Sequence, residues 1–263
     1  MTTNIFEVNS KTIACDSRWS VDNDESDFIL YSDKTGFKKL ISVNDNSIVF
    51  AGYLKSVNNW ILWFLGGFKS TEIPSADGVS LSIINARGEI KYTTESVKIL
   101  EIKDFVAAFS GSGSDFAIPK WDRNIRTRRN SNVSELMDFA VLNDIYTGGE
   151  LTIKKIEEVT QKDHSCTPCD FEEFNRVFLE TGYVFMKNTG KIVRYNDAEA
   201  SIKSSVEEMR GRSMMNFAAP FYGMHKNHTK EESEKIALNV RSCLLGEREG
   251  KKDRNRPAGT PSN

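Results

Sequence analysis

The sequence predicts an α+β fold in which antiparallel sheets pack against helices. Apolar runs of strand length come in pairs separated by short polar turns, a pattern typical of β-hairpins. Segments with apolar residues at helical spacing stand between blocks of hairpins instead of following every strand, which disfavours a parallel sheet. With 263 residues, of which 39% are hydrophobic, the chain is long enough for one large core.

The first half of the chain carries most of the predicted strands. A turn at Asn9 and Ser10 separates strands at 5–8 and 12–15, which predicts an opening hairpin. A second hairpin is predicted at 39–43 and 48–52, around a polar turn. A polar stretch at 22–27 is expected to be a loop, and the remaining strands of this half are expected at 28–31, 81–86, 89–93, 105–109 and 151–156.

Four helices are predicted from the spacing of apolar residues. Val57, Trp60 and Ile61 share one face of a helix at 56–65, which Gly66 and Gly67 end. The other helices are expected at 132–144, 171–179 and 230–245, with a further hairpin at 183–195. We expect a main domain at 1–157, a mixed extension of unknown role at 158–246 and a disordered, charged tail at 247–263.

Composition narrows the class of protein. Lys and Arg (35) nearly balance Asp and Glu (37), so the formal charge of -2 gives no global reason to expect nucleic acid or an anionic membrane as partner. The longest apolar run, at 60–68, is far shorter than the roughly 20 residues that span a bilayer. The first ten residues lack the basic and apolar regions of a signal peptide, and four cysteines do not form a disulfide framework. These features predict a protein of the reducing cytoplasm.

The common catalytic motifs are missing. The sequence has no Gly-x-Ser-x-Gly elbow, no P-loop and no His-Glu-x-x-His motif. The three histidines, His164, His225 and His228, all lie beyond residue 160, so a Ser-His-Asp triad is hard to assemble from the first half. Any catalysis is therefore expected to work without histidine.

An amino-terminal threonine supplies such chemistry. Its hydroxyl is the nucleophile, and its own α-amino group, with an unperturbed pKa of about 7.7–8.0, is a base suited to neutral pH. Methionine is usually removed when the next residue is small, so Met1 and Thr2 could yield a free threonine terminus. Many proteins begin with Met-Thr, and the start of the chain alone does not decide the matter.

Five sequence features that follow in order support the interpretation of Thr2 as a nucleophile. They are Ala14-Cys15-Asp16-Ser17-Arg18, Lys39, Phe50-Ala51-Gly52, Gly111-Ser112-Gly113 and Asp144-Ile145-Tyr146-Thr147-Gly148-Gly149. This set resembles the proteasome β-subunit and HslV-type peptidase family, especially the short proteasome-like proteins of bacteria and their phages. The resemblance covers roughly residues 1–156. It implies an N-terminal-nucleophile (Ntn) hydrolase fold, an αββα sandwich of antiparallel sheets between helices.

The resemblance also implies roles for individual residues. Thr2 matches the nucleophile, and Asp16 and Lys39 match the acid and lysine beside it. A buried ammonium near the threonine lowers the pKa of its amine and hydroxyl, while the carboxylate keeps the lysine charged and oriented. Lys39 is preferred to Lys38 because its spacing to Val43 and Asp45 matches that of the family.

The remaining matches concern substrate binding and proton transfer. Gly52 corresponds to the glycine whose backbone N–H faces the oxyanion. Ser112, Asp144 and Thr147 correspond to the polar cluster that hydrogen-bonds the terminal amine. Ser20 stands where a hydroxyl residue pairs with the substrate backbone, and Phe50 where the family lines its specificity pocket. The resemblance implies a peptide or unfolded-protein substrate, a homo-oligomer, a possible ATP-dependent unfoldase partner and no cofactor.

Other interpretations remain open. The same residues could serve an Ntn amidase acting on a small non-peptide amide, or the fold could be a catalytically silent scaffold whose extension provides the functional surface. Asp16 could be a turn acid and Lys39 a solvated strand residue. Cys166 and Cys169, with His164, could form half a zinc site, but at most three ligands are local and no metal is expected. The basic residues Arg123, Arg126, Arg128 and Arg129 are more simply explained by solvent or a neighbouring subunit than by nucleic acid.

Overall fold

A computed structural model describes residues 2–22, 25–129, 132–160, 164–211, 215–220 and 224–246. Over these residues the protein is α+β, and its strands form two antiparallel sheets, as the spacing of hairpins predicts. The predicted tail at 247–263 lies outside the described residues. No helix within the described ranges is long and apolar enough to cross a bilayer.

The first sheet has the strand order β11-β2-β1-β10-β9. Its members are β1 (Asn4–Glu7), β2 (Thr12–Asp16), β9 (Lys98–Ile102), β10 (Phe105–Ser110) and β11 (Leu151–Lys155). The opening hairpin forms as predicted, and its register pairs Asn4 with Cys15. This register brings Thr2, just before β1, beside Asp16 at the end of β2.

The second sheet has the order β13-β12-β4-β3-β14-β6-β7-β8, with β5 paired to β6. Its members from the main domain are β3 (Trp19–Asp22), β4 (Phe28–Ser32), β5 (Leu40–Val43), β6 (Asn46–Tyr53), β7 (Val79–Asn85) and β8 (Ile90–Thr93). The predicted extension adds β12 (Tyr183–Met186), β13 (Ile192–Arg194) and β14 (Ala218–Ala219). The extension therefore completes a sheet that the main domain begins.

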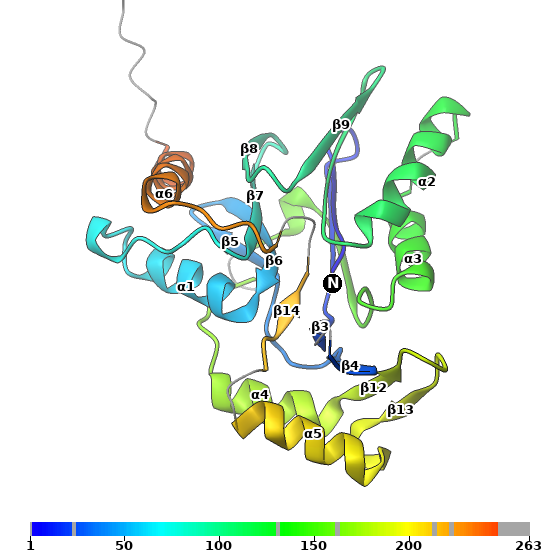
Figure 1. Ribbon diagram of the computed structural model, residues 1–263. Coiled ribbons are helices and arrows are strands. Elements are labelled where there is room, and N and C mark those ends of the chain that lie inside the picture. Colours follow the sequence, from blue (N-terminus) through cyan, green and yellow to red (C-terminus); the bar gives the residue numbers. More distant parts are fainter. Residues whose placement is uncertain are drawn as a thin grey trace, which may run out of the picture.

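Helices cover the outer faces of both sheets (Figure 1). On the first sheet, α2 (Ser114–Arg126) and α3 (Val133–Asn143) bury Trp121 and Leu136 against Phe109. The second sheet packs against α1 (Leu54–Leu65), α4 (Phe171–Thr181), α5 (Ala200–Gly211) and α6 (Lys230–Leu245). Short 3₁₀ helices are η1 (Ser70–Glu72), η2 (Ile156–Glu158) and η3 (Tyr195–Asp197).

The inner faces of the two sheets meet each other. Phe6 and Ile13 of the first sheet lie in one buried cluster with Leu40, Val49 and Ile84 of the second. The layers therefore run helices, sheet, sheet, helices. Lys39 immediately precedes β5 of the second sheet, so its side chain can reach across the interface to Asp16 of the first.

Several elements differ from the sequence prediction. The strands β3, β9 and β14 and the helices α2 and α5 were not predicted. In α2 the basic residues mask the apolar face, and Pro119 stands inside the helix, where proline is disfavoured. With only two residues, β14 is too short to show the alternation of apolar and polar residues that predicts a strand. It forms because β3 and β6 pair with it on either side.

Candidate functional site

Thr2, Asp16 and Lys39 come together between the two sheets. The Thr2 hydroxyl donates a hydrogen bond to Asp16 Oδ1, and Lys39 Nζ donates to Thr2 Oγ1 at 2.8 Å. Lys39 Nζ also lies 3.1 Å from Asp16 Oδ1, an ion pair whose two side chains are both fully buried. The hydroxyl is thus held between a carboxylate acceptor and an ammonium donor.

The Lys39 ammonium has an acceptor for each of its three protons. Besides Thr2 and Asp16, it donates to the carbonyl oxygen of Arg18. Burial lowers the pKa of Lys39, and the negative charge of Asp16 opposes that shift. The arrangement therefore places a cation beside the hydroxyl, although removing that cation from water costs free energy.

Backbone N–H groups fix the orientation of Asp16. Thr3 N donates to Oδ1 at 3.1 Å, while Gly148 N and Arg18 N donate to Oδ2 at 3.0 and 3.3 Å. These donors come from the residue before β1, from the turn before β11 and from the second residue after β2. Strand pairing thus aims the carboxylate at Thr2.

Ser112, Asp144 and Thr147 form a second polar cluster. Ser112 Oγ and Thr147 Oγ1 donate to Asp144 Oδ2 at 2.5 and 2.7 Å. The cluster reaches the start of the chain through Thr3, whose Oγ1 lies 2.8 Å from Thr147 Oγ1. The structure therefore joins these three predicted residues to one another and to the Thr3 hydroxyl. Their expected contact with the Thr2 amine depends on the state of Met1, which lies outside the described residues.

Gly52 lies in β6 with a positive φ of 134°. A Cβ atom at this position would lie 2.1 Å from the Gly78 carbonyl oxygen, so no other residue fits without moving the backbone. Phe50 is fully buried two positions earlier, with its ring 6.3 Å from that of Phe64. Its carbonyl oxygen accepts from Asn4 Nδ2 at 3.1 Å, which ties β6 to the start of β1.

Ser20 and Gly52 lie on opposite sides of β14. Ala218 pairs with Ser20 of β3, and Ala219 pairs with Gly52 of β6. Ser20 Oγ donates to the Ala218 carbonyl oxygen at 3.3 Å. The two predicted substrate-binding positions are thus connected through a strand of the extension.

Three residues of the site were not singled out from the sequence. Thr3 and Gly148 donate to Asp16 as described, and the motif residue Arg18 provides the carbonyl for Lys39. The Arg18 guanidinium also pairs with Asp33 at 2.7 and 2.9 Å and lies 4.0 Å above the Tyr31 ring. Arg18 and Gly148 both stand in motifs quoted from the sequence, but neither was assigned a role, and the Gly148 contact depends on how β11 pairs with β2.

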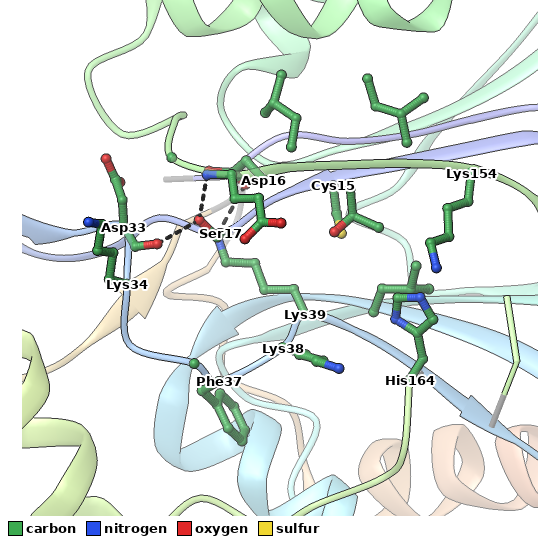
Figure 2. A pocket seen from close by; sticks show the side chains of 17 residues that line it. Cys15, Asp16, Ser17, Asp33, Lys34, Phe37, Lys38, Lys39, Lys154 and His164 are labelled. Carbon is green, nitrogen blue, oxygen red and sulfur yellow. Dashed lines mark hydrogen bonds and ion pairs between the residues drawn. The ribbon is translucent and has the colours of Figure 1, made fainter. Parts of the chain in front are cut away.

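A cavity of about 970 Å³ lies beside Asp16 and Lys39. Figure 2 shows Lys154 and His164 on one side of it and Asp33 on the other, with Lys39 extending between them toward Asp16. Cys15 also lines the cavity, and burial, together with the nearby Asp16 charge, raises the pKa of its thiol to about 12. Cys15 is therefore a neutral thiol near neutral pH.

Cys166, Cys169 and His164, considered above as an alternative zinc site, are not grouped as metal ligands in the described part of the chain. Within the ranges that the structure describes, no three His, Cys, Asp or Glu side chains are grouped to hold a metal ion. Cys166 Sγ instead lies 3.9 Å from the Ile61 carbonyl oxygen, and Cys169 N donates to Asn58 Oδ1 at 2.7 Å. Both cysteines attach the extension to α1.

Comparisons of the chain with protein-family models, with curated proteins and with solved structures found no match.

Proposed function

We propose that the protein is an N-terminal-threonine peptidase with the proteasome-type Ntn fold, in which Thr2 becomes the nucleophile once Met1 is removed. The observation that carries this proposal is the contact of Lys39 Nζ with Thr2 Oγ1 at 2.8 Å, inside a buried ion pair with Asp16. Burying a lysine costs free energy unless it is paired with an opposite charge. A hydroxyl that contacts both an ammonium and a carboxylate is placed as an activated nucleophile would be. The layering of helices around two antiparallel sheets is consistent with the proposed fold.

In the proposed reaction Thr2 Oγ1 attacks the carbonyl carbon of a peptide bond. The free α-amine takes the hydroxyl proton, and Lys39 stabilises the negative charge that grows on the oxygen. The Gly52 N–H donates to the oxyanion. Collapse of the tetrahedral intermediate breaks the C–N bond, and the departing amine receives the proton. Water then hydrolyses the threonyl ester and returns the hydroxyl.

The second cluster has a proposed supporting role. Asp144 accepts from Ser112 and Thr147, and Thr147 contacts Thr3, so the cluster fixes the backbone next to the nucleophile. We propose that the same hydroxyls hydrogen-bond the α-amine once it is free. A homo-oligomer and an unfoldase partner remain predictions from the resemblance alone.

A catalytically silent member of the same fold is the second candidate. The pairing of β14 with Ser20 and Gly52 favours it, because that strand lies at the positions proposed for substrate. An Ntn amidase would share the catalytic residues and differ in its substrate.

Hydrolysis of fluorogenic peptides by the purified full chain tests the proposal. Turnover should be lost in Thr2→Ala and partly retained in Thr2→Ser, because serine keeps the hydroxyl. Thr229→Ser, at the cap of α6, is a matched control because the Thr229 hydroxyl accepts a hydrogen bond from Glu232 N of the same helix, and the variant should retain full activity. Turnover that survives in Thr2→Ala would refute the proposed nucleophile, and a folded wild type with no turnover on any peptide or amide would favour the silent scaffold.

A further inference from the structure

The second sheet is joined across its middle by β14 alone among the described strands. One part of the sheet comprises β13, β12, β4 and β3, and the other comprises β6, β7 and β8 with β5. Between β3 and β6 lies a position one strand wide, which β14 fills with Ala218 and Ala219 (Figure 1). This position is called the strand slot below.

The backbone of the occupying segment follows a regular antiparallel register. Leu54 N donates to the Phe217 carbonyl oxygen at 2.8 Å, and the register continues with Ala218 opposite Tyr53 and Ala219 opposite Gly52. Hydrogen-bonded pairs recur at every second residue of an antiparallel ladder. The register therefore directs the Ala219 carbonyl toward the Gly52 N–H, the proposed oxyanion donor.

The side chains of the occupying segment are mostly small, so the slot holds this segment mainly through its backbone. Ala218 and Ala219 are small and buried, and Ser20 Oγ contacts the Ala218 carbonyl oxygen. The larger Phe217 packs its ring 5.0 Å from that of Phe174 and 4.8 Å from that of Phe178 on α4. Backbone pairing with one anchored side chain is how a peptide binds by strand addition.

We propose that the strand slot binds an extended polypeptide strand, and that residues 217–219 are an internal occupant that competes with it. The position of substrate in the slot rests on the proposed function, but the competition is a statement about binding alone. The apparent affinity for peptide is the intrinsic affinity multiplied by the fraction of molecules in which the slot is free, so the occupant raises the peptide concentration needed for binding. The extension thereby gains a role as an intramolecular inhibitor.

Peptide binding to the full chain tests this inference. The probe is a fluorescent peptide with the sequence of residues 215–220, measured by anisotropy in a Thr2→Ala background so that turnover plays no part. Ala219→Asp places a carboxylate at a fully buried position and should displace the occupant. We expect it to tighten peptide binding by about tenfold or more, whereas Ala200→Asp, at an exposed position of α5, should leave binding unchanged.

A crosslink provides the opposite test and keeps the native arrangement. Ala218 and Tyr53 form a non-hydrogen-bonded pair, whose side chains approach closely enough for a disulfide in Ala218→Cys/Tyr53→Cys. Oxidation should abolish peptide binding and reduction should restore it, while Ala218→Cys alone should respond to neither. If Ala219→Asp fails to fold, the Ala218→Cys/Tyr53→Cys variant alone tests whether residues 217–219 compete with peptide.

Several outcomes would overturn the inference. They are a failure of the disulfide to form, peptide binding that is unchanged by the crosslink, and a folded Ala219→Asp protein with wild-type affinity. Failure of the proposed function gives a different result. Peptide binding would then respond as expected in both variants, while the Ala219→Asp protein and the reduced cysteine pair, each with Thr2 intact, would bind peptide without hydrolysing it.

Discussion

Lys39 is the charged residue that supports the Thr2 nucleophile in the proposed chemistry. Lys39→Ala removes the cation beside the Thr2 hydroxyl, and peptide turnover is expected to fall about 10²–10³-fold, the range for losing one group that stabilises developing negative charge. The fold should persist, because Asp16 keeps the N–H donors of Thr3, Arg18 and Gly148. Activity assays with a thermal melt measure both effects.

The neighbouring Lys38 is the matched control for Lys39. Lys38 is exposed, and Lys38→Ala should therefore retain turnover and stability close to those of the wild type. Equal losses in both variants would contradict the assignment of Lys39, and so would unchanged peptide hydrolysis in Lys39→Ala.

Cys15 lies beside Asp16 in sequence but is too deeply buried to serve as a nucleophile near neutral pH. Its thiol pKa is raised to about 12, chiefly by burial, so iodoacetamide at pH 8 should leave Cys15 unmodified in the native protein. In urea, where the thiol is exposed, all four cysteines should react. Peptide mapping by mass spectrometry gives the result, and rapid alkylation of native Cys15 would reopen a thiol mechanism.

Within β6, Gly52 has a positive φ and packs closely against the backbone of Gly78. Gly52→Ala would bring a Cβ atom to 2.1 Å from the Gly78 carbonyl at a positive φ, so it should destabilise the protein by several kcal/mol and disrupt the proposed oxyanion donor. Gly67→Ala has a positive φ but nothing within 4 Å, and should cost only about 1–2 kcal/mol. Urea unfolding compares the two variants, and equal losses would show that the close approach to Gly78 is unimportant.

Local signals allowed some elements to be predicted well. The helix at 230–245 agrees with α6, which begins at the Thr229 capping box and ends before Gly246 in a left-handed conformation. The opening hairpin likewise follows from its turn and apolar runs. By contrast, β14 could not be predicted, since its two alanines carry no periodicity and are defined by strands about 165 and 200 residues earlier in the chain.

The site shows the same division between local and long-range information. Thr2, Asp16 and Lys39 were selected through ordered motifs, and the structure brings them together. Thr3 and Gly148 were missed because their contacts depend on how β1, β2 and β11 pair. The role of Phe50 in a specificity pocket stays a prediction, and in the structure its side chain is fully buried with its ring 6.3 Å from that of Phe64.

On the scale of the whole molecule, the extension belongs to the main core. Phe178 of α4 and Val240 of α6 lie in the same buried cluster as Trp60 of α1. A fragment ending at residue 157 would expose this apolar surface, so it should bind a hydrophobic dye and lack a cooperative melt. The full chain should unfold in one transition. An independently folded fragment 1–157 would contradict this view of the core.

The proposed mechanism requires Thr2 to supply both the hydroxyl and a free amine. Reaction of the full chain with a peptide epoxyketone, which needs both groups to form its ring adduct, followed by intact mass and peptide mapping, tests this most directly. We expect a protein without Met1 that gains one adduct on Thr2, retained in Cys15→Ser and absent in Thr2→Ala. Retention of Met1, or a Met1-free folded protein that gains no adduct on Thr2 even in the Ala219→Asp variant, would contradict it.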